Sequence, residues 1–390
     1  MGNTLKYSLN AISYTFITLT IGGSLLQIYL IEQGLSDEKT ALFFSIMRAI
    51  QTATILLVMH LASYTRRAAP GSAFPFFAAL PFCIFLLSLT PSADIPQLSL
   101  YLFGSVFYVA IGAYCIFSYR LPYTTLHMES YGQILGITGA ISAALGLAVS
   151  LAITLLQNIF SFVRIMRGVF ILSACVSLIG IISTVTLRER IADRPRHERS
   201  RVHLLTYRPF RSLIVANLLR GITGGVITIA VTLGYAVDLL DAHSATLSVI
   251  ITGVATMLAS LLFSYLSKKV HSSVLILLSA IAAAAAMPFL LIGNTVTFFI
   301  FLALITFFVA IEDIAVPVAV SSIVHVDIIA RYTGGRMLLH TLGTSLASYS
   351  AVMLLAALSP FSLMLLTGVV HLIFATIYYQ YFKNKIRRPL

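Results

Sequence analysis

Charged residues are scarce in this sequence of 390 residues: Asp, Glu, Lys and Arg together make up 10% of it, whereas hydrophobic residues make up 59%. The mean hydropathy is +0.97. Soluble globular domains contain about a quarter charged residues, so this composition excludes a soluble domain. At roughly 20 residues per crossing, twelve membrane helices would use about 240 residues and leave only short loops. The function is therefore expected to lie inside the membrane.

Cysteine is also rare, and the common enzyme motifs are absent. The three cysteines are Cys83, Cys115 and Cys175. They lie in apolar runs without C-x-x-C spacing, which predicts small buried side chains rather than a disulfide framework or a metal site. No H-E-x-x-H, G-x-S-x-G or P-loop spacing is present, so we expect neither an enzyme nor a bound cofactor or metal. The lack of N-x-S/T sites and of a cleavable signal is typical of a bacterial cytoplasmic membrane protein.

Twelve apolar runs are long enough to span a membrane, and the breaks between them carry turn or charged residues. They predict an all-α integral membrane protein with twelve transmembrane helices. The predicted spans are roughly 8–31, 40–64, 72–90, 98–121, 131–156, 162–186, 213–238, 244–266, 273–293, 296–322, 334–358 and 361–382.

Basic residues fall between these runs and mostly on one side of the membrane. If the N-terminus is cytoplasmic, 20 of the 25 Lys and Arg residues lie on that side and two lie within helices. The three on the opposite side are Lys39, Arg164 and Arg167. The positive-inside rule therefore predicts that both the N-terminus and the C-terminus are cytoplasmic.

One long polar stretch divides the chain. Residues 188–212 hold eight Arg against three acids and predict a basic cytoplasmic linker between two six-helix bundles, residues 1–187 and residues 213–390. The net charge of +12 would suggest nucleic-acid binding in a soluble protein. Here a solvated loop beside anionic lipid headgroups is the simpler explanation.

Shifting the sequence by 201 residues aligns its two halves. Ser63 and Tyr64 fall on Ser264 and Tyr265, and a basic pair follows each within a few residues. The same offset superimposes two stripes, namely Gly132, Gly136, Gly139, Ala143, Gly146, Ser150 and Thr333, Met337, His340, Thr344, Ala347, Ala351. Alternating spacings of four and three put each stripe on one helix face. Small residues there let a neighbouring helix approach, so we expect packing and rocking surfaces.

Two pseudo-symmetric six-helix halves, a basic central loop and a parallel repeat resemble the major facilitator superfamily of secondary transporters, over essentially the whole chain. The loop after the second helix in that family reads G-x-L-x-D-R-x-G-R-R, whereas here it reads HLASYTRRAAPGS and keeps only Arg66 and Arg67. The fourth-helix Arg and the fifth-helix G-P pair of antiporters are absent. The resemblance implies alternating access and a central cavity lined by the first, fourth, seventh and tenth helices.

Each of those four helices carries polar residues on one face of an otherwise apolar sequence. The repeat supports this pattern, because the 201-residue shift carries Ser105 of the fourth helix onto Thr306 of the tenth. The residues predicted to form the substrate cavity are Arg48, Asn10, Tyr14, Tyr101, Ser105, Tyr108, Tyr119, Asn217, Thr228, Tyr235 and Thr306. For each of them the alternative is a hydrogen bond between helices that only holds the bundle together.

Four charged residues lie well away from the ends of the predicted helices: Arg48, Arg220, Glu312 and Asp313. An unpartnered charge at the bilayer centre costs at least ~2.5–3.5 kcal/mol on insertion scales. At ~1.5 Å rise per residue, Arg220 and Asp313 differ in depth by only ~3 Å, so we expect them to pair. Glu312 lies ~100° from Asp313 around the helix, which favours Asp313 as the cavity group. His340 lies at a similar depth and would complete a proton-labile cluster.

This cluster predicts proton coupling. Desolvation favours the neutral form of a carboxyl group and a nearby Arg favours its ionised form, so movement of the Arg switches the protonation state. We predict that Asp313 or Glu312 carries the proton, that Arg220 modulates it or anchors a substrate anion, and that His340 is a relay. The cluster also looks like the proton site of some symporters of the superfamily. The alternative is a static ion pair between the seventh and tenth helices.

Three further polar residues in apolar helices, Arg48, His60 and His371, need an explanation. Arg48 has no acidic partner in its own half, so it either binds an anionic substrate group or caps backbone carbonyls at a helix break. His60 and His371 are lone histidines in apolar helices, and we predict that they are polar packing or interface residues rather than ligands.

The sequence thus predicts a proton-coupled secondary active transporter of a small organic solute in the cell membrane. A cavity with Arg, carboxylate and Tyr suits an amphipathic anion or zwitterion. The alternatives are an uncoupled facilitator of the same fold, an integral-membrane enzyme, and a transport-inactive scaffold or receptor. The expected partners are the solute, protons and membrane lipids, without nucleic acid, and the expected state is a monomer.

Overall fold

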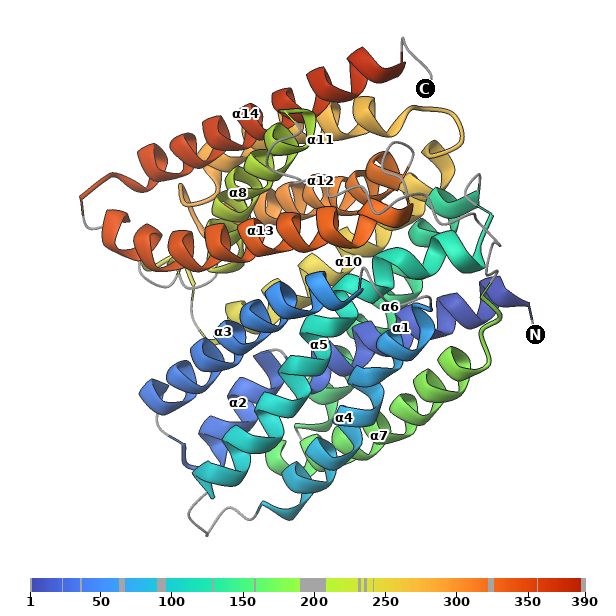
Figure 1. Cartoon of the computed structure of the whole chain (residues 1–390). Helices are drawn as coiled ribbons and strands as arrows, with labels where there is room; N and C mark the ends of the chain where they lie inside the picture. The colour runs from blue at the N-terminus through green and yellow to red at the C-terminus, as the bar shows by residue number, and fades with distance from the viewer. Residues whose placement is uncertain are drawn as a thin grey trace. The chain divides into compact units, whose positions relative to one another are not determined.

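The structure is a computed structural model of the whole chain. It describes residues 2–22, 24–35, 37–62, 67–89, 96–127, 130–157, 159–189, 208–230, 233–234, 237–240, 242–321, 326–355 and 357–386. The regular structure over these residues is helical (Figure 1). The helices are α1 (Asn3–Ile21), α2 (Ser24–Glu32), α3 (Asp37–Ala62), α4 (Ala69–Ser88), α5 (Gln97–Thr125), α6 (Tyr131–Leu156), α7 (Phe162–Val185), α8 (Arg208–Thr228), α10 (Ala242–Leu266), α11 (Ser272–Ala286), the 3-10 helix η2 (Met287–Phe289), α12 (Thr295–Ser321), α13 (Val326–Leu355) and α14 (Pro360–Ile386).

Each predicted span overlaps one or two of these helices, although α13 begins at Val326, before the predicted start at residue 334. α6 occupies the predicted residues 131–156, and the ninth span, 273–293, is α11 followed by η2. The α-helix ends there because Pro288 has no amide hydrogen to continue it. Seven of the described helices are long and apolar enough to cross a membrane by length and composition, and three further apolar helices are shorter.

The first predicted span, 8–31, is wrong as a single helix. The chain leaves the α-helix at Gly22 and resumes it at Ser24, so two consecutive helices occupy this span. Glycine tolerates such a break because it has no Cβ. The carbonyl of Gly22, freed at the break, accepts a hydrogen bond of 2.9 Å from the hydroxyl of Tyr108 on α5. This hydrogen bond satisfies the Gly22 carbonyl, which would be costly to leave without a donor in an apolar setting.

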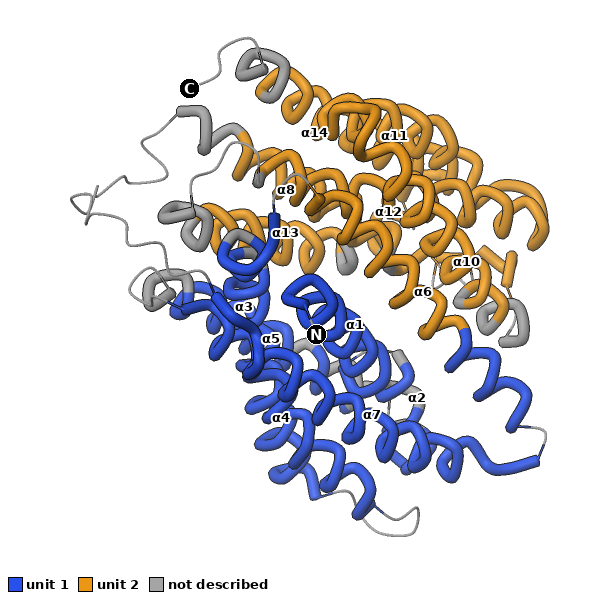
Figure 2. The backbone as a smooth tube through the Cα atoms, turned by 90° about the vertical axis from the view of Figure 1, so that its right-hand side faces the viewer, with its two compact units in different colours: residues 1–127, 148–193 blue, residues 128–147, 194–390 orange. Residues whose placement is uncertain are grey.

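The helices group into two compact units (Figure 2). Unit 1 comprises residues 1–127 and 148–193, and unit 2 comprises residues 128–147 and 194–390. The boundary thus passes through α6, whose first part groups with the later helices. The predicted linker lies largely outside the described residues, and the division into two bundles at 188–212 stays a prediction.

α4 is the central helix of unit 1 and packs against α1, α5 and α7. Glycines permit this close packing. Gly180 of α7 lies against the ring of Phe76 on α4, where a Cβ would lie only 2.4 Å from a ring carbon. Gly71 of α4 lies in the same way against Phe117 of α5. Close contact of this kind stabilises helix pairs in lipid, which supplies no hydrophobic force between them.

The N-terminus of α4 is capped from a distance. The carboxylate of Glu189, just beyond α7, accepts the amide hydrogens of Ala68 at 2.9 Å and Ala69 at 2.7 Å. These amides precede the first intrahelical bonds, and a negative charge there complements the helix dipole.

We therefore expect Glu189→Ala to lower the free energy of unfolding by about 1 kcal/mol. The shift is measured as the melting temperature of the purified protein in detergent. The control is Glu32→Ala, which removes an exposed acid of the same unit and should leave the melting temperature unchanged. Equal shifts in the two variants would contradict the capping role.

In unit 2 the most extensive helix contact joins α8 to α13. Gly221 and Gly225 of α8 lie directly against the backbone of α13. A Cβ at Gly221 would lie 2.2 Å from the carbonyl oxygen of His340, and one at Gly225 would lie 2.6 Å from that of Thr344. The hydroxyl of Thr344 donates to the carbonyl of Gly221 at 3.2 Å. The two helices thus meet backbone to backbone.

The predicted glycine stripe of α6 is also a packing surface within unit 2. Its first glycines and their α10 neighbours are Gly132 with Ser267, Gly136 with Ser264 and Gly139 with Ser260. A Cβ at Gly136 would lie 2.7 Å from the Cβ of Ser264. Because the matching stripe of α13 lies against α8, the packing role of both stripes is confirmed. Rocking at these surfaces stays a prediction.

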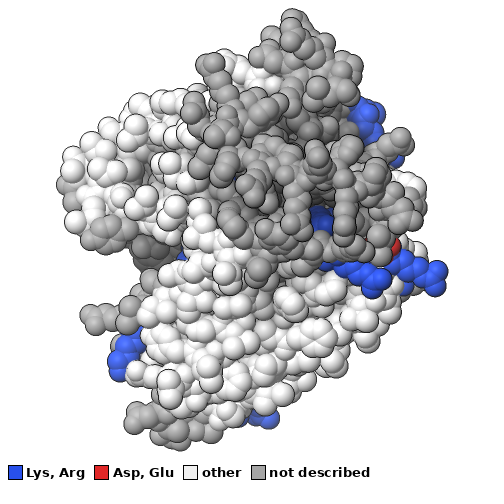
Figure 3. All heavy atoms as spheres, in the orientation of Figure 1, with Lys and Arg blue, Asp and Glu red and all other residues white. Residues whose placement is uncertain are grey.

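Many large apolar side chains point outward, as expected for helices that face lipid. Leu98 is 85% exposed and Ile84 is 66% exposed. On the face shown in Figure 3, most of the described surface carries no charge, and Lys and Arg appear at only a few places. Cys83 and Cys115 are buried as predicted, but the prediction was wrong for Cys175, which is exposed. It lies on an outer face of α7, where an apolar side chain needs no cover in a membrane.

Candidate functional site

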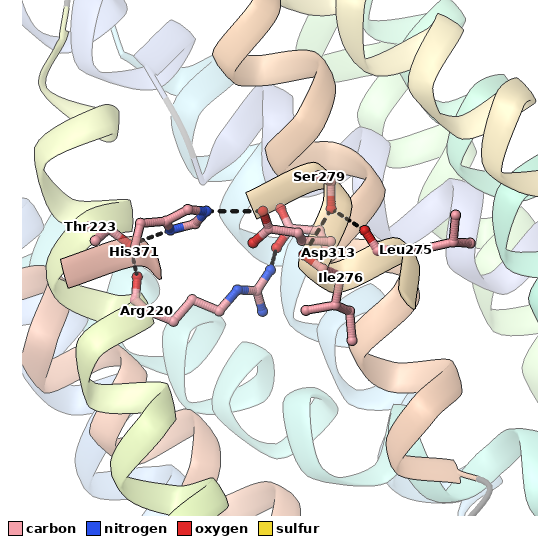
Figure 4. A network of polar contacts seen from close by, with 8 residues as sticks. Arg220, Thr223, Leu275, Ile276, Ser279, Asp313 and His371 are labelled. Atoms are coloured by element: carbon pink, nitrogen blue, oxygen red, sulfur yellow. Dashed lines mark hydrogen bonds and ion pairs between the residues drawn. The ribbon is translucent and has the colours of Figure 1, made fainter. Parts of the chain in front are cut away.

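An ion pair and a buried acid of unit 2 lie where α8, α12 and α14 come together (Figure 4). The Nη2 atom of Arg220 on α8 forms an ion pair with Oδ1 of Asp313 on α12. The Arg220 side chain is 11% exposed, whereas that of Asp313 is 62% exposed. The guanidinium also lies 5.7 Å from the ring centroid of Phe374 on α14. The pairing predicted from helix depth is therefore confirmed.

Glu312 precedes Asp313 in the chain but points elsewhere. Its side chain is fully buried, and its Oε1 lies 2.9 Å from Nε2 of His371 on α14. Its Oε2 has no hydrogen-bond partner among the described residues. One helical residue turns a side chain by about 100°, which explains why one acid is exposed and its neighbour is enclosed. The two acids thus point in different directions, as predicted, and that Asp313 faces a substrate cavity stays a prediction.

His371, predicted to be a polar packing or interface residue, is buried and bonds to side chains of two other helices. The sequence analysis missed its pairing with Glu312. Its Nδ1 lies 3.2 Å from the hydroxyl of Thr223 on α8, and that hydroxyl donates to the carbonyl of Arg220 at 3.0 Å. Glu312 lies 59 positions away in the chain. No spacing rule relates residues so far apart, so the sequence offered no signal for the contact.

His340 lies on α13 beside the ion pair. The nearest atom to a Cβ built at Gly224 is His340 Cε1, at 3.6 Å, so the imidazole lies over this part of α8. The charged groups that act on His340 are Arg220, Asp313 and Arg336. Its Nδ1 makes no hydrogen bond to the described residues. The structure thus brings His340 to the predicted cluster, while its role as a relay stays a prediction.

Asn217, predicted to face the cavity, is 1% exposed and donates to the hydroxyl of Tyr378 at 2.7 Å. This contact joins α8 to α14, as expected under the alternative in which Asn217 forms a hydrogen bond between helices rather than lining a cavity. Thr306 is half-buried on α12. The side chain of Thr228 and all of Tyr235 lie outside the described residues.

In unit 1 the predicted cavity residues also take part in contacts between helices. Asn10 of α1 donates to Thr184 of α7 at 2.5 Å and accepts from the hydroxyl of Tyr114 on α5 at 3.0 Å. Tyr14 stacks on Tyr114 with ring centroids 3.7 Å apart. These contacts, and the bond from Tyr108 to the break after α1, tie α1 to α5 and α7.

The remaining predicted residues of unit 1 are more open. Arg48 is exposed and acts electrostatically on the buried Tyr108. Tyr101 and Ser105 are half-buried, and the side chain of Tyr119 lies outside the described residues, as does that of His60.

A cavity of about 370 Å³ in unit 1 lies between the second part of α6 and α7, but its lining is apolar apart from Arg164. None of the predicted substrate residues lines it. Among the described residues, no group of three or more His, Cys, Asp or Glu side chains is placed to hold a metal ion. The polar network around Arg220 is therefore the candidate site.

Comparison with known proteins gives matches in structure. The E. coli fucose:proton symporter FucP matches with a TM-score of 0.71 at 13% identity, over 97% of this chain and 99% of that chain. A double-Trp mutant of XylE matches with a TM-score of 0.73 at 15% identity, over 97% and 95% of the two chains. The human organic anion transporter MFSD10 matches with a TM-score of 0.68 at 10% identity, over 96% and 97%. The chain has the major facilitator fold.

The major facilitator fold confirms the predicted class of a multi-pass, all-α membrane protein. No family model matches the sequence, and no curated protein matches it. At 10–15% identity the structural matches establish the fold alone. The cytoplasmic location of the termini stays a prediction.

Proposed function

We propose that this protein is a secondary active transporter that moves a small organic solute by alternating access and couples this movement to protons. The observation that carries the proposal is the pair of adjacent acids in an apolar helix, of which exposed Asp313 pairs with Arg220 and buried Glu312 pairs with His371. Ionisable groups are costly in a membrane, and they mark ion and proton pathways.

Asp313 is the proposed proton-carrying group, because its side chain is open while its Arg partner is mostly enclosed. Movement of Arg220 away from Asp313 would let the carboxylate take up a proton in place of its ion-pair partner, and the return of Arg220 would release that proton. Glu312 is the second carboxyl of the site, and His340 is the proposed relay beside the ion pair. Arg220 also offers a guanidinium to an anionic solute when Asp313 is protonated.

The substrate class proposed is an amphipathic anion or zwitterion. Arg220 supports this choice, because its guanidinium lies in an apolar part of unit 2 and can bind an anionic group. The similarity to MFSD10, described as an organic anion transporter, is consistent with an anion. FucP and XylE, described as proton symporters of fucose and xylose, are consistent with proton coupling.

The test uses purified protein in liposomes with a panel of organic anions, zwitterions and sugars. A gradient of one pH unit is worth about 1.4 kcal/mol per proton, so one-to-one coupling sustains roughly tenfold accumulation. We expect wild type to accumulate one class of solute and to move protons on its addition, as followed with a pH-sensitive dye. Asp313→Asn should lose gradient-driven accumulation and retain exchange of the solute across the membrane.

The matched control is Glu32→Gln, an exposed acid outside the site, which should behave as wild type. Flux that ignores the pH gradient would favour an uncoupled facilitator. Failure to bind or move any solute would favour a scaffold or receptor.

A further inference from the structure

Four groups form a continuous chain of contacts between α12, α14 and α8. Glu312 Oε1 lies 2.9 Å from His371 Nε2, and His371 Nδ1 lies 3.2 Å from Thr223 Oγ1. Thr223 Oγ1 lies 3.0 Å from the carbonyl oxygen of Arg220. The last acceptor is a peptide carbonyl, which cannot donate. Because the Arg220 carbonyl can only accept, it sets the direction of each hydrogen bond in this series of four groups.

The hydroxyl of Thr223 has a single hydrogen, and it donates that hydrogen to the carbonyl of Arg220. Toward His371, Thr223 must then accept, so Nδ1 of the imidazole carries a hydrogen. In a neutral imidazole the other nitrogen is an acceptor. Nε2 therefore needs a donor, and the group that faces it is Glu312.

The other oxygen of Glu312 points to the same protonation state. Glu312 is fully buried, and its Oε2 has no hydrogen-bond partner among the described residues. An ionised oxygen without a donor in an apolar setting is far more costly than the carbonyl oxygen of a neutral acid. We propose that Glu312 is a carboxylic acid that donates its hydrogen to neutral His371, and that Thr223 orients this pair as a proton site separate from Asp313.

The described ionisable groups on the helices around this pair include one cation close to it. On α8 the nearby cation is Arg220, which is engaged by Asp313 of α12. On α13 His340 lies within reach of the charges of Arg220, Asp313 and Arg336, and on α14 the next ionisable side chain is Tyr378. α11 and η2, which also pack against α12 or α14, contain no ionisable side chain. On α10, the remaining helix against α12, the described side chains include Tyr265, which is 61% exposed.

The consequence is an exchange between the two acids. Glu312 loses its proton without a large penalty only if a cation replaces it, and Arg220 is the cation already bound to the adjacent residue. Transfer of Arg220 from Asp313 to Glu312 would release a proton from Glu312 while Asp313 takes one up. A role for this exchange in transport rests on the proton coupling proposed above. The protonation state of Glu312 can be measured without any solute.

The first experiment compares infrared spectra of purified wild type and variants at fixed pH values between about 5 and 9, in the carboxyl-stretch region where protonated acids absorb. We expect a band at neutral pH that is lost in Glu312→Gln and retained in Arg220→Gln. In Asp313→Asn, where Arg220 is released, this band should disappear at a lower pH than in wild type. The double variant Asp313→Asn with Arg220→Gln should restore it.

The second experiment tests the orientation of the imidazole by nitrogen NMR of protein labelled at its 9 histidines. The signals of His371 are those lost in His371→Asn. They should report hydrogen on Nδ1 and none on Nε2. Thr223→Val, which removes the acceptor, should lose this preference, whereas Thr223→Ser, which keeps the hydroxyl, should retain it.

Two results would overturn the inference: absence of a neutral-pH carboxyl band assignable to Glu312, or a His371 with hydrogen on Nε2. Failure of the proposed function is distinct. If these signatures are found but no solute moves protons, Glu312 holds its proton in a protein that is not proton-coupled. If transport is proton-coupled but the signatures are absent, Asp313 acts alone.

Discussion

Gly221→Ala is expected to lower the free energy of unfolding by about 3 kcal/mol, the upper part of the usual range for overpacked sites. The added Cβ would lie 2.2 Å from the carbonyl oxygen of His340 and 2.9 Å from its Cα. Both atoms belong to the backbone of α13, so no side-chain rotation relieves the contact. α8 and α13 must separate, and the bond from Thr344 to the carbonyl of Gly221 would lengthen with them.

The matched control is Gly224→Ala, one turn further along α8. A Cβ there would meet only the ring carbon Cε1 of His340 at 3.6 Å, an ordinary contact. Alanine is also the better helix former by about 1 kcal/mol, so this variant should be neutral or slightly more stable. Melting temperatures in the same detergent compare the two directly. Equal values would show that α8 and α13 are not in backbone contact.

The second large effect is expected at the buried pair of Glu312 and His371. His371→Leu removes the hydrogen-bond partner of a fully buried carboxyl group, which should cost about 1–3 kcal/mol of stability. Glu312→Leu leaves Nε2 of His371 without a partner and should cost a similar amount. With both residues replaced by leucine, no polar group is left unsatisfied at this contact. The double variant should therefore lose at least about 1 kcal/mol less than the sum of the single losses.

A control pair tests whether this coupling is specific. Ser177 on α7 is buried and bonds to the carbonyl of Ser173 within its own helix, so it shares no partner with Glu312. Ser177→Ala combined with Glu312→Leu should give additive changes in unfolding free energy, measured by denaturation in detergent. Additivity in the Glu312 and His371 pair as well would show that the two side chains do not interact.

Membrane spans were predictable because each is a long apolar run bounded by polar residues, as in α6, where the predicted and observed limits agree. What hydropathy does not report is the path of the backbone inside a run. The break at Gly22 and the 3-10 turn at Pro288 lie within apolar sequence, so their hydropathy is that of a continuous helix. Their positions depend on backbone freedom and on a missing amide hydrogen.

The candidate site was predictable to the extent that charge in a membrane is costly. Arg220 and Asp313 were matched because each needs a partner and their depths agree, and the structure pairs them. The contact between His371 and Glu312 was not predicted, because a neutral histidine in an apolar helix does not require a charged partner. Thr223 was missed for a related reason, since a threonine in a helix can satisfy itself on its own backbone.

The break between α1 and α2 has a mechanical consequence. An interrupted helix is a hinge, and a free hinge would let its two arms bend independently. Here the carbonyl of Gly22, at the break, is hydrogen-bonded to the hydroxyl of Tyr108 on α5. Bending about Gly22 must either draw that part of α5 along or leave a carbonyl unsatisfied in an apolar environment, at a cost of several kcal/mol. The hydrogen bond therefore couples the two movements. A change in the angle between α1 and α2 that keeps this bond requires α5 to move with them.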